Sequence, residues 1–176
     1  MFSPSEMLRK YNKNGWCATE TKHLPSHVKE GIRLAGFRPL MKQCFGNSQK
    51  ICVLQRKHSF TYCEGIVESD SIKGYYLDHA WIMDVDGFHY DLTLNPAPKV
   101  IAHKEYTVED INNNLRKTNL WCPINQIWLN YVQFALNFDI DFNCSEEELI
   151  KKVDKHRNDL YEEMERVRIE QEQKNI

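Results

Sequence analysis

Residues 79–93 read HAWIMDVDGFHYDLT, and this stretch decides how the chain folds. Aromatic and aliphatic residues alternate with polar ones on both sides of the Asp86-Gly87 pair, which is a frequent turn sequence. The pattern predicts two antiparallel strands, over residues 77–84 and 88–94. We therefore expect a small antiparallel sheet, and the other elements are placed relative to it.

The length of the turn fixes which side chains share a face of this sheet, because successive side chains of a strand point to opposite faces. A two-residue turn would place His79 and Asp91 on opposite faces. A three-residue loop over residues 85–87, with Gly87 in the left-handed region, would make His79 and Asp91 diagonal neighbours on one face.

Two segments upstream add further polar groups. A helix is expected from residue 44 to about residue 55, because apolar residues recur there at helical spacing. Cys44 would begin this helix, where unpaired N–H groups and the helix dipole stabilise a negative group such as a thiolate. Residues 59–67 alternate like a strand that contains Glu64 and Gly65, and a glycine there indicates a bulge or a close backbone approach.

Cys44, His79 and Asp91 supply a thiol, an imidazole and a carboxylate, in that order along the chain. A thiol attacks a carbonyl well only as the thiolate. An imidazole can take the thiol proton, and a carboxylate can hold that imidazole in the required tautomer. Such a triad requires the three-residue loop, because only that loop puts the imidazole and the carboxylate on one face.

Four short motifs carry a resemblance to a known family, and they lie at residues 44–47 (CFGN), 62–65 (YCEG), 79–81 (HAW) and 91–93 (DLT). The region over residues 44–95 resembles the core of the transglutaminase-like branch of the papain-like cysteine enzymes. It is most similar to small bacterial and phage proteins with the motifs Cys-x-x-Asn, Tyr-x-Glu-Gly, His-Ala-Trp and Asp-x-Thr. The chain ends lie outside the resemblance.

This resemblance implies an α+β fold in which a small antiparallel sheet packs against the helix that carries the nucleophilic Cys44, with additional C-terminal helices. It implies that His79 is the base and that Asp91 orients it. The implied reaction is acyl transfer on an amide of a protein or peptide, as in a peptidase, a deamidase or a transglutaminase. No cofactor and no metal are implied.

Four neighbouring residues are expected to support the triad: Gln43, Asn47, Glu64 and Trp81. Gln43 or Asn47 could join the backbone N–H groups of the helix start in binding an oxyanion. Trp81 belongs to the motif that carries the base. The role of Glu64 stays open, because it could orient His79 or a substrate, or be a buried structural acceptor or an exposed carboxylate.

Two other functions are compatible with the same residues. A non-catalytic binding or inhibitory protein, such as a phage accessory protein, could retain the fold without the activity. The hairpin acids Asp84, Asp86 and Asp91, with His79 and His89, could instead bind a metal ion. The hairpin lacks the later glutamate that a calcium loop needs, and turn chemistry explains its acids, so no metal site is expected.

The composition argues against several other classes. The formal net charge is −2 and basic residues are scattered among acids, so no basic stripe for nucleic acid is expected. No apolar run approaches the ~20 residues needed to cross a bilayer, and the first residues do not resemble a signal peptide. None of the six cysteines forms Cys-x-x-Cys. We therefore expect reduced thiols and a cytoplasmic location.

Residues 1–143 are expected to form one domain, and residues 144–176 to form a long polar C-terminal helix that packs only partly against it. This helix begins with a capping box at Ser145. Its narrow apolar stripe could pack along the domain or pair with another chain, which leaves self-association open. Other helices are expected over residues 4–11, 25–35 and 123–138 and after Thr107, with a short strand at residues 100–101.

Overall fold

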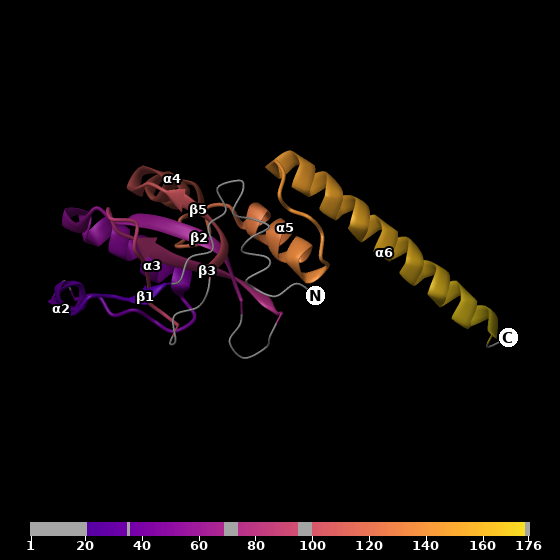
Figure 1. Cartoon of the computed structure of the whole chain (residues 1–176), viewed down its shortest axis with the longest axis horizontal. Helices are drawn as coiled ribbons and strands as arrows, with labels where there is room; N and C mark the ends of the chain where they lie inside the picture. Colours follow the sequence, from indigo (N-terminus) through magenta and orange to yellow (C-terminus); the bar gives the residue numbers. More distant parts are fainter. Residues whose placement is uncertain (1–20, 35, 69–73, 95–99, 175–176) are drawn as a thin grey trace.

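The computed structural model is shown in Figure 1, and it describes residues 21–34, 36–68, 74–94 and 100–174. The helix expected over residues 4–11 lies outside the described residues. The described part has the α+β fold that the sequence predicts, with helices packed against an antiparallel sheet.

The described sheet has five strands in the order β1-β4-β3-β2-β5. Strands β2 to β5 pair in antiparallel fashion, whereas the short β1 runs parallel to β4. Strand β5 is longer than the sequence predicts because it pairs with almost the whole of β2. The strands are β1 (Lys22–His23), β2 (Thr61–Glu68), β3 (Tyr76–Met83), β4 (His89–Asp91) and β5 (Val100–Tyr106).

The β3–β4 hairpin has the three-residue loop that the triad requires, which confirms that prediction. Ile82 pairs with Tyr90, and the Asp84 N–H donates to the Phe88 carbonyl at 3.0 Å. Residues 85–87 therefore form the loop, and Gly87 has a φ of +78°, in the left-handed region. With this register, the side chains of His79 and Asp91 share one face.

Helices cover the opposite face of the sheet. Ile51 of α3 lies in one apolar cluster with Tyr62 and Ile82, and Leu129 of α5 lies in another with Ile66. These strand residues share a face because Tyr62 pairs with Ile82 in the antiparallel register. The described helices are α2 (Ser26–Leu34), α3 (Cys44–Leu54), the 3-10 helix η2 (Arg56–His58), α4 (Val108–Thr118), α5 (Gln126–Asn137) and α6 (Glu146–Lys174).

Capping side chains set where α4 and α5 begin. Thr107 caps α4 as expected, because its hydroxyl accepts from the Asp110 N–H while the Asp110 carboxylate accepts from the Thr107 N–H. Helix α5 begins at Gln126, later than the predicted residue 123. The Asn125 side chain accepts from the Trp128 N–H at 3.0 Å, so the cap itself defines this later start.

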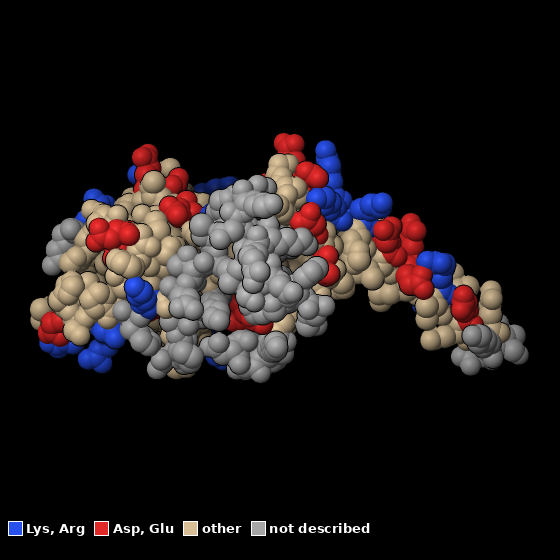
Figure 2. All heavy atoms as spheres, in the orientation of Figure 1, with Lys and Arg blue, Asp and Glu red and all other residues tan. Residues whose placement is uncertain are grey.

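Among the described residues, helix α6 packs against the rest of the fold through its first turns. Leu149 and Val153 are buried in the α5 cluster, whereas Tyr161 and Met164 are exposed. Figure 1 shows the remainder of α6 extending away from the sheet, and Figure 2 shows acidic and basic side chains intermixed along it. Self-association through this segment stays a prediction. Within the described ranges, no helix has the length and apolar character needed to span a membrane.

Gly65 is required by the close approach of β2 to β5. A Cβ at this position would lie 2.0 Å from the Ala102 carbonyl oxygen and 2.9 Å from the His103 Cα, which are backbone atoms. We expect Gly65→Ala to lower the free energy of unfolding, measured by urea denaturation, by about 3 kcal/mol or more.

Gly31→Ala is the matched control. In the interior of α2, the nearest heavy atom to a new Cβ is the Gln55 side-chain oxygen at 3.9 Å. Alanine should therefore fit there and stabilise the protein by up to about 1 kcal/mol through its higher helix propensity. Equal stability of the Gly65→Ala variant and the wild type would contradict the close approach described for β2.

Candidate active site

Asp91 ends β4 and is held in place by its own turn. Its Oδ1 atom accepts hydrogen bonds from the Thr93 N–H at 2.7 Å and the Leu94 N–H at 2.8 Å. Its Oδ2 atom contacts the Nε2 atom of His79. Although burial opposes ionisation, the bonds from His79 and from these N–H groups hold the pKa of Asp91 below its usual range. The Asp-x-Thr motif thus fixes the carboxylate and aims its second oxygen at the imidazole.

His79 on β3 is buried between its carboxylate partner and an aromatic ring. The indole of Trp81 stacks beside it with ring centroids 6.2 Å apart and an interplanar angle of 20°. Burial alone would lower the pKa of His79, but the hydrogen bonds to Asp91 and Cys44 outweigh it and raise the pKa to about 9. Because Asp91 occupies Nε2, the Nδ1 atom is the nitrogen left for the thiol.

Cys44 is the first residue of α3, as the sequence predicts, and its side chain is half-buried. It interacts with the His79 imidazole across the fold. The first N–H groups of a helix have no partner within the helix and carry a partial positive charge. The structure therefore joins His79 to Asp91, and it places the Cys44 thiol at a helix start, close enough to His79 to affect the pKa of the imidazole.

Asn47 and Gln43, the two predicted oxyanion supports, differ in their surroundings. The side-chain amide of Asn47 forms two hydrogen bonds with the backbone of Leu40. Its oxygen accepts from the Leu40 N–H at 3.0 Å, and its nitrogen donates to the Leu40 carbonyl at 2.7 Å. It thereby ties the segment before Cys44 to α3. Gln43 occupies the N-cap position, is exposed, and makes no capping bond with its side chain. A role in oxyanion binding stays a prediction for both residues.

Glu64 is a fully buried acceptor that links β2 to the start of α5. Its carboxylate accepts from the Tyr62 hydroxyl at 2.8 Å and from the N–H groups of Ile124 and Asn125 at 2.5 and 3.1 Å. Burial raises the pKa of Glu64 despite these bonds. Of the roles left open by the sequence, the contacts favour the buried structural acceptor.

Replacing Glu64 tests that role. In Glu64→Gln one carboxylate oxygen becomes an NH2 group that would face the N–H of either Ile124 or Asn125, so at least one buried donor would lose its partner. We expect a loss of about 1–3 kcal/mol in the free energy of unfolding, measured by urea denaturation. The alkylation rate of Cys44 should stay near that of the wild type, and a large drop in that rate would instead place Glu64 in the reaction.

A pocket of about 570 Å³ opens beside Asp91, between α2 and the end of β4. Its lining is mainly apolar, with three exposed cations. Arg33 pairs with Glu30, whereas no ion pair is found among the described residues for Lys29 and Arg38. Asp91 lines the pocket, whereas Cys44 and His79 do not. The apolar lining residues include Leu24, Ile32, Phe37 and Leu92.

Of the hairpin acids considered as metal ligands from the sequence, Asp84 accepts hydrogen bonds within its own turn, and Asp91 contacts His79. The Asp84 carboxylate accepts from the N–H groups of Asp86 and Phe88 at 3.0 and 2.9 Å and from the Tyr90 hydroxyl. These bonds are the turn chemistry that the sequence predicts for this loop.

A second polar cluster was missed by the sequence analysis. Cys63, His89 and His103 meet on the face of the sheet that carries Trp81. Burial, and then the neighbouring His103, lower the pKa of His89 to about 4. The three residues come from three strands, so no spacing along the chain could have revealed them.

Comparison of the chain with models of known protein families, with curated proteins and with solved structures gives no match.

Proposed function

We propose that this protein is a cysteine-dependent enzyme that transfers or hydrolyses the acyl group of an amide, with Cys44, His79 and Asp91 as its catalytic residues. The observation that carries the proposal is the contact between the His79 imidazole and the Asp91 carboxylate, beside a thiol, Cys44, that helps to raise the pKa of His79. The three groups are those that a cysteine enzyme needs, in the order thiol, imidazole and carboxylate.

In the proposed reaction the proton of the Cys44 thiol first passes to Nδ1 of His79, and the resulting thiolate then attacks the amide carbonyl carbon. The carbonyl oxygen becomes an oxyanion, which the N–H groups at the start of α3 stabilise. His79 then gives the proton to the leaving amine, and the C–N bond breaks to leave a thioester on Cys44. Water or a second amine attacks the thioester, His79 accepts its proton, and the thiol is restored.

Asp91 acts through the orientation of His79. Its carboxylate accepts the proton carried by Nε2, so the basic lone pair of the neutral imidazole lies on Nδ1, toward Cys44. It also stabilises the imidazolium that forms when His79 takes the thiol proton, and this agrees with the raised pKa of His79.

The pocket beside Asp91 is the proposed site for the side chain of a protein or peptide substrate. Its apolar lining suits an aliphatic or aromatic group, and the cations Lys29 and Arg38 suit acidic residues next to that group. The pocket also favours the alternative function, a binding protein without catalysis, because neither Cys44 nor His79 lines it.

Acylation by p-nitrophenyl acetate tests the proposed enzyme against the binding protein. The ester transfers its acetyl group to an activated thiol and releases coloured p-nitrophenolate. We expect a burst close to one equivalent in the wild-type protein and an acetyl group on Cys44 by mass spectrometry.

The burst should be absent in Cys44→Ala and retained in Cys122→Ala, which removes another half-buried thiol. An unchanged burst in Cys44→Ala, or no burst in the wild type, would favour the binding protein.

A further inference from the structure

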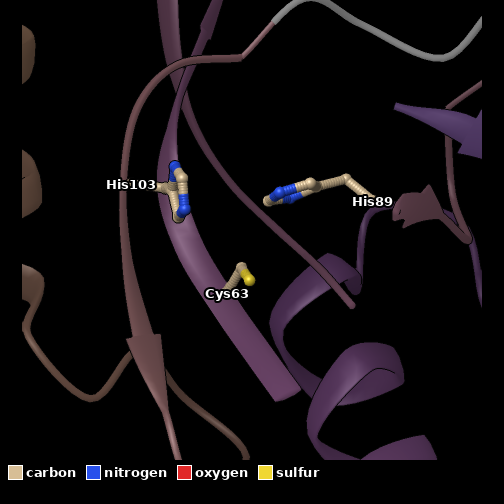
Figure 3. A group of neighbouring side chains, drawn as sticks. All are labelled: Cys63, His89 and His103. Atoms are coloured by element: carbon tan, nitrogen blue, oxygen red, sulfur yellow. The ribbon is translucent and has the colours of Figure 1, made fainter. Parts of the chain in front are cut away.

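Three metal-ligating side chains converge on the face of the sheet opposite the helices. Figure 3 shows Cys63, His89 and His103 pointing toward one another, and they come from β2, β4 and β5. One potential ligand atom from each lies within 4.8 Å of the other two. Cys63 and His89 are buried, and His103 is half-buried, so the three groups are held by a packed sheet.

We propose that Cys63, His89 and His103 bind a divalent metal ion that prefers thiolate and imidazole ligands, such as Zn²⁺, with water as the fourth ligand. Thiolate sulfur and imidazole nitrogen are the ligands that Zn²⁺ prefers, at about 2.0–2.3 Å. Ligand atoms around a tetrahedral ion of that size lie roughly 3.3–3.8 Å apart. Closing the cluster onto an ion therefore needs movements of about 1 Å, which small side-chain rotations supply. This proposal does not rest on the proposed catalytic function.

The surroundings of His103 fit those of a ligating histidine. Its Nε2 atom lies 3.4 Å from a carboxylate oxygen of Glu105, and its Nδ1 atom is buried. A carboxylate that accepts from one ring nitrogen orients the other nitrogen and makes it a better ligand. Glu105 is exposed, so it can take this outer position without entering the cluster.

Metal binding should change the environment of Trp81, because the Trp81 indole donates a hydrogen bond to His89, one of the proposed ligands. The Trp81 Nε1–H donates to Nδ1 of His89 at 2.7 Å, so the neutral imidazole of His89 carries its proton on Nε2. If the metal ion binds Nε2 of His89, the ring proton must move to Nδ1. If it binds Nδ1, it uses the lone pair that accepts from the indole. In both cases the hydrogen bond between Trp81 and His89 breaks. The Cys63 thiol releases its proton to solvent as the sulfur–metal bond forms.

The experiment uses the full-length protein, stripped of metal with a chelator and then titrated with Zn²⁺ in competition with a chromophoric chelator. We expect one Zn²⁺ per chain and a loss of affinity of tenfold or more in Cys63→Ala and in His103→Gln. Cys52→Ala is the matched control, because Cys52 is an equally buried thiol that lies outside the cluster. Its affinity should equal that of the wild type.

A second measurement uses the wild-type protein alone, so its result does not depend on whether a variant folds. The wild-type protein loaded with Co²⁺ should show a near-ultraviolet sulfur-to-metal charge-transfer band, and Zn²⁺ should change the tryptophan fluorescence as the Trp81 bond breaks. Absence of the sulfur band would overturn the site. Affinity retained in both cluster variants, or lost to the same extent in Cys52→Ala, would also overturn it, since the binding would then come from other groups.

Discussion

Alkylation of Cys44 should slow by roughly a thousandfold between pH 8 and pH 5 in His79→Ala, and by less than about tenfold in the wild-type protein. An unassisted thiol has an ordinary pKa of about 8.5, so its reactive thiolate falls about tenfold for each pH unit below that value. In the wild type, the pKa of His79 is about 9, which keeps a positively charged imidazolium beside the sulfur over this range. That charge favours the thiolate, so the rate should stay high at low pH.

The measurement is the rate of iodoacetamide labelling, followed by mass spectrometry of the peptide that contains each cysteine. Cys144 provides an internal reference, since the pKa of its thiol is raised, chiefly by burial, and its charged neighbours are Lys152 and acidic residues. Its profile should be the same in both proteins. If Cys44 follows the same pH profile in the wild type and in His79→Ala, the imidazole does not activate the thiol, and the binding-protein alternative becomes the better explanation.

The hairpin could be predicted from the sequence because the rules that govern it are local. Asp86-Gly87 and the flanking alternation specify the strands but allow a turn of two or three residues, and only the requirement of the triad favoured three. In the structure Gly87 has the left-handed conformation that the three-residue loop needs. Once the loop has three residues, His79 and Asp91 must lie on the same face of the sheet, and this can be worked out from the hairpin residues alone. The contact between Cys44 and His79 is different. It joins a helix to a strand, and only the family resemblance predicted it.

The role of Glu64 could not be decided from the sequence, since two of its partners lie far along the chain. The N–H groups of Ile124 and Asn125 come 60 and 61 residues later, and nothing near Glu64 indicates them. The cluster of Cys63 and the two histidines was missed for the same reason. Pairing of β2 with β5 brings His103 opposite Gly65, and such long-range pairing is set by the whole sheet.

Replacing Asp91 by asparagine should remove the activation of Cys44 while leaving the turn intact. The amide oxygen of the new side chain can still accept from the N–H groups of Thr93 and Leu94. Its N–H group, however, would face Nε2 of His79, which must then act as the acceptor. The neutral imidazole would carry its proton on Nδ1, toward Cys44, and could not take the thiol proton. We expect the alkylation profile of Cys44 in Asp91→Asn to resemble that in His79→Ala.

The same variant should change how stability depends on pH. The folded-state pKa of His79, about 9, lies above the unfolded value of about 6.5, so its contribution is fully present below pH 6.5 and is lost as pH rises through 9. This loss, on the order of 3 kcal/mol for such a shift, should appear in urea unfolding of the wild type between pH 6.5 and pH 9. In Asp91→Asn the partner charge is gone, and most of that pH dependence should disappear with it.

Asp84→Asn is the matched control for this measurement. Asp84 also accepts from two backbone N–H groups in its own turn, but its remaining oxygen bonds the Tyr90 hydroxyl instead of a histidine. The control should lower the free energy of unfolding and keep the slope between pH 6.5 and pH 9. An equally steep slope in Asp91→Asn and in the wild type would show that Asp91 does not hold the proton on His79, because removing a carboxylate that did so would flatten the slope.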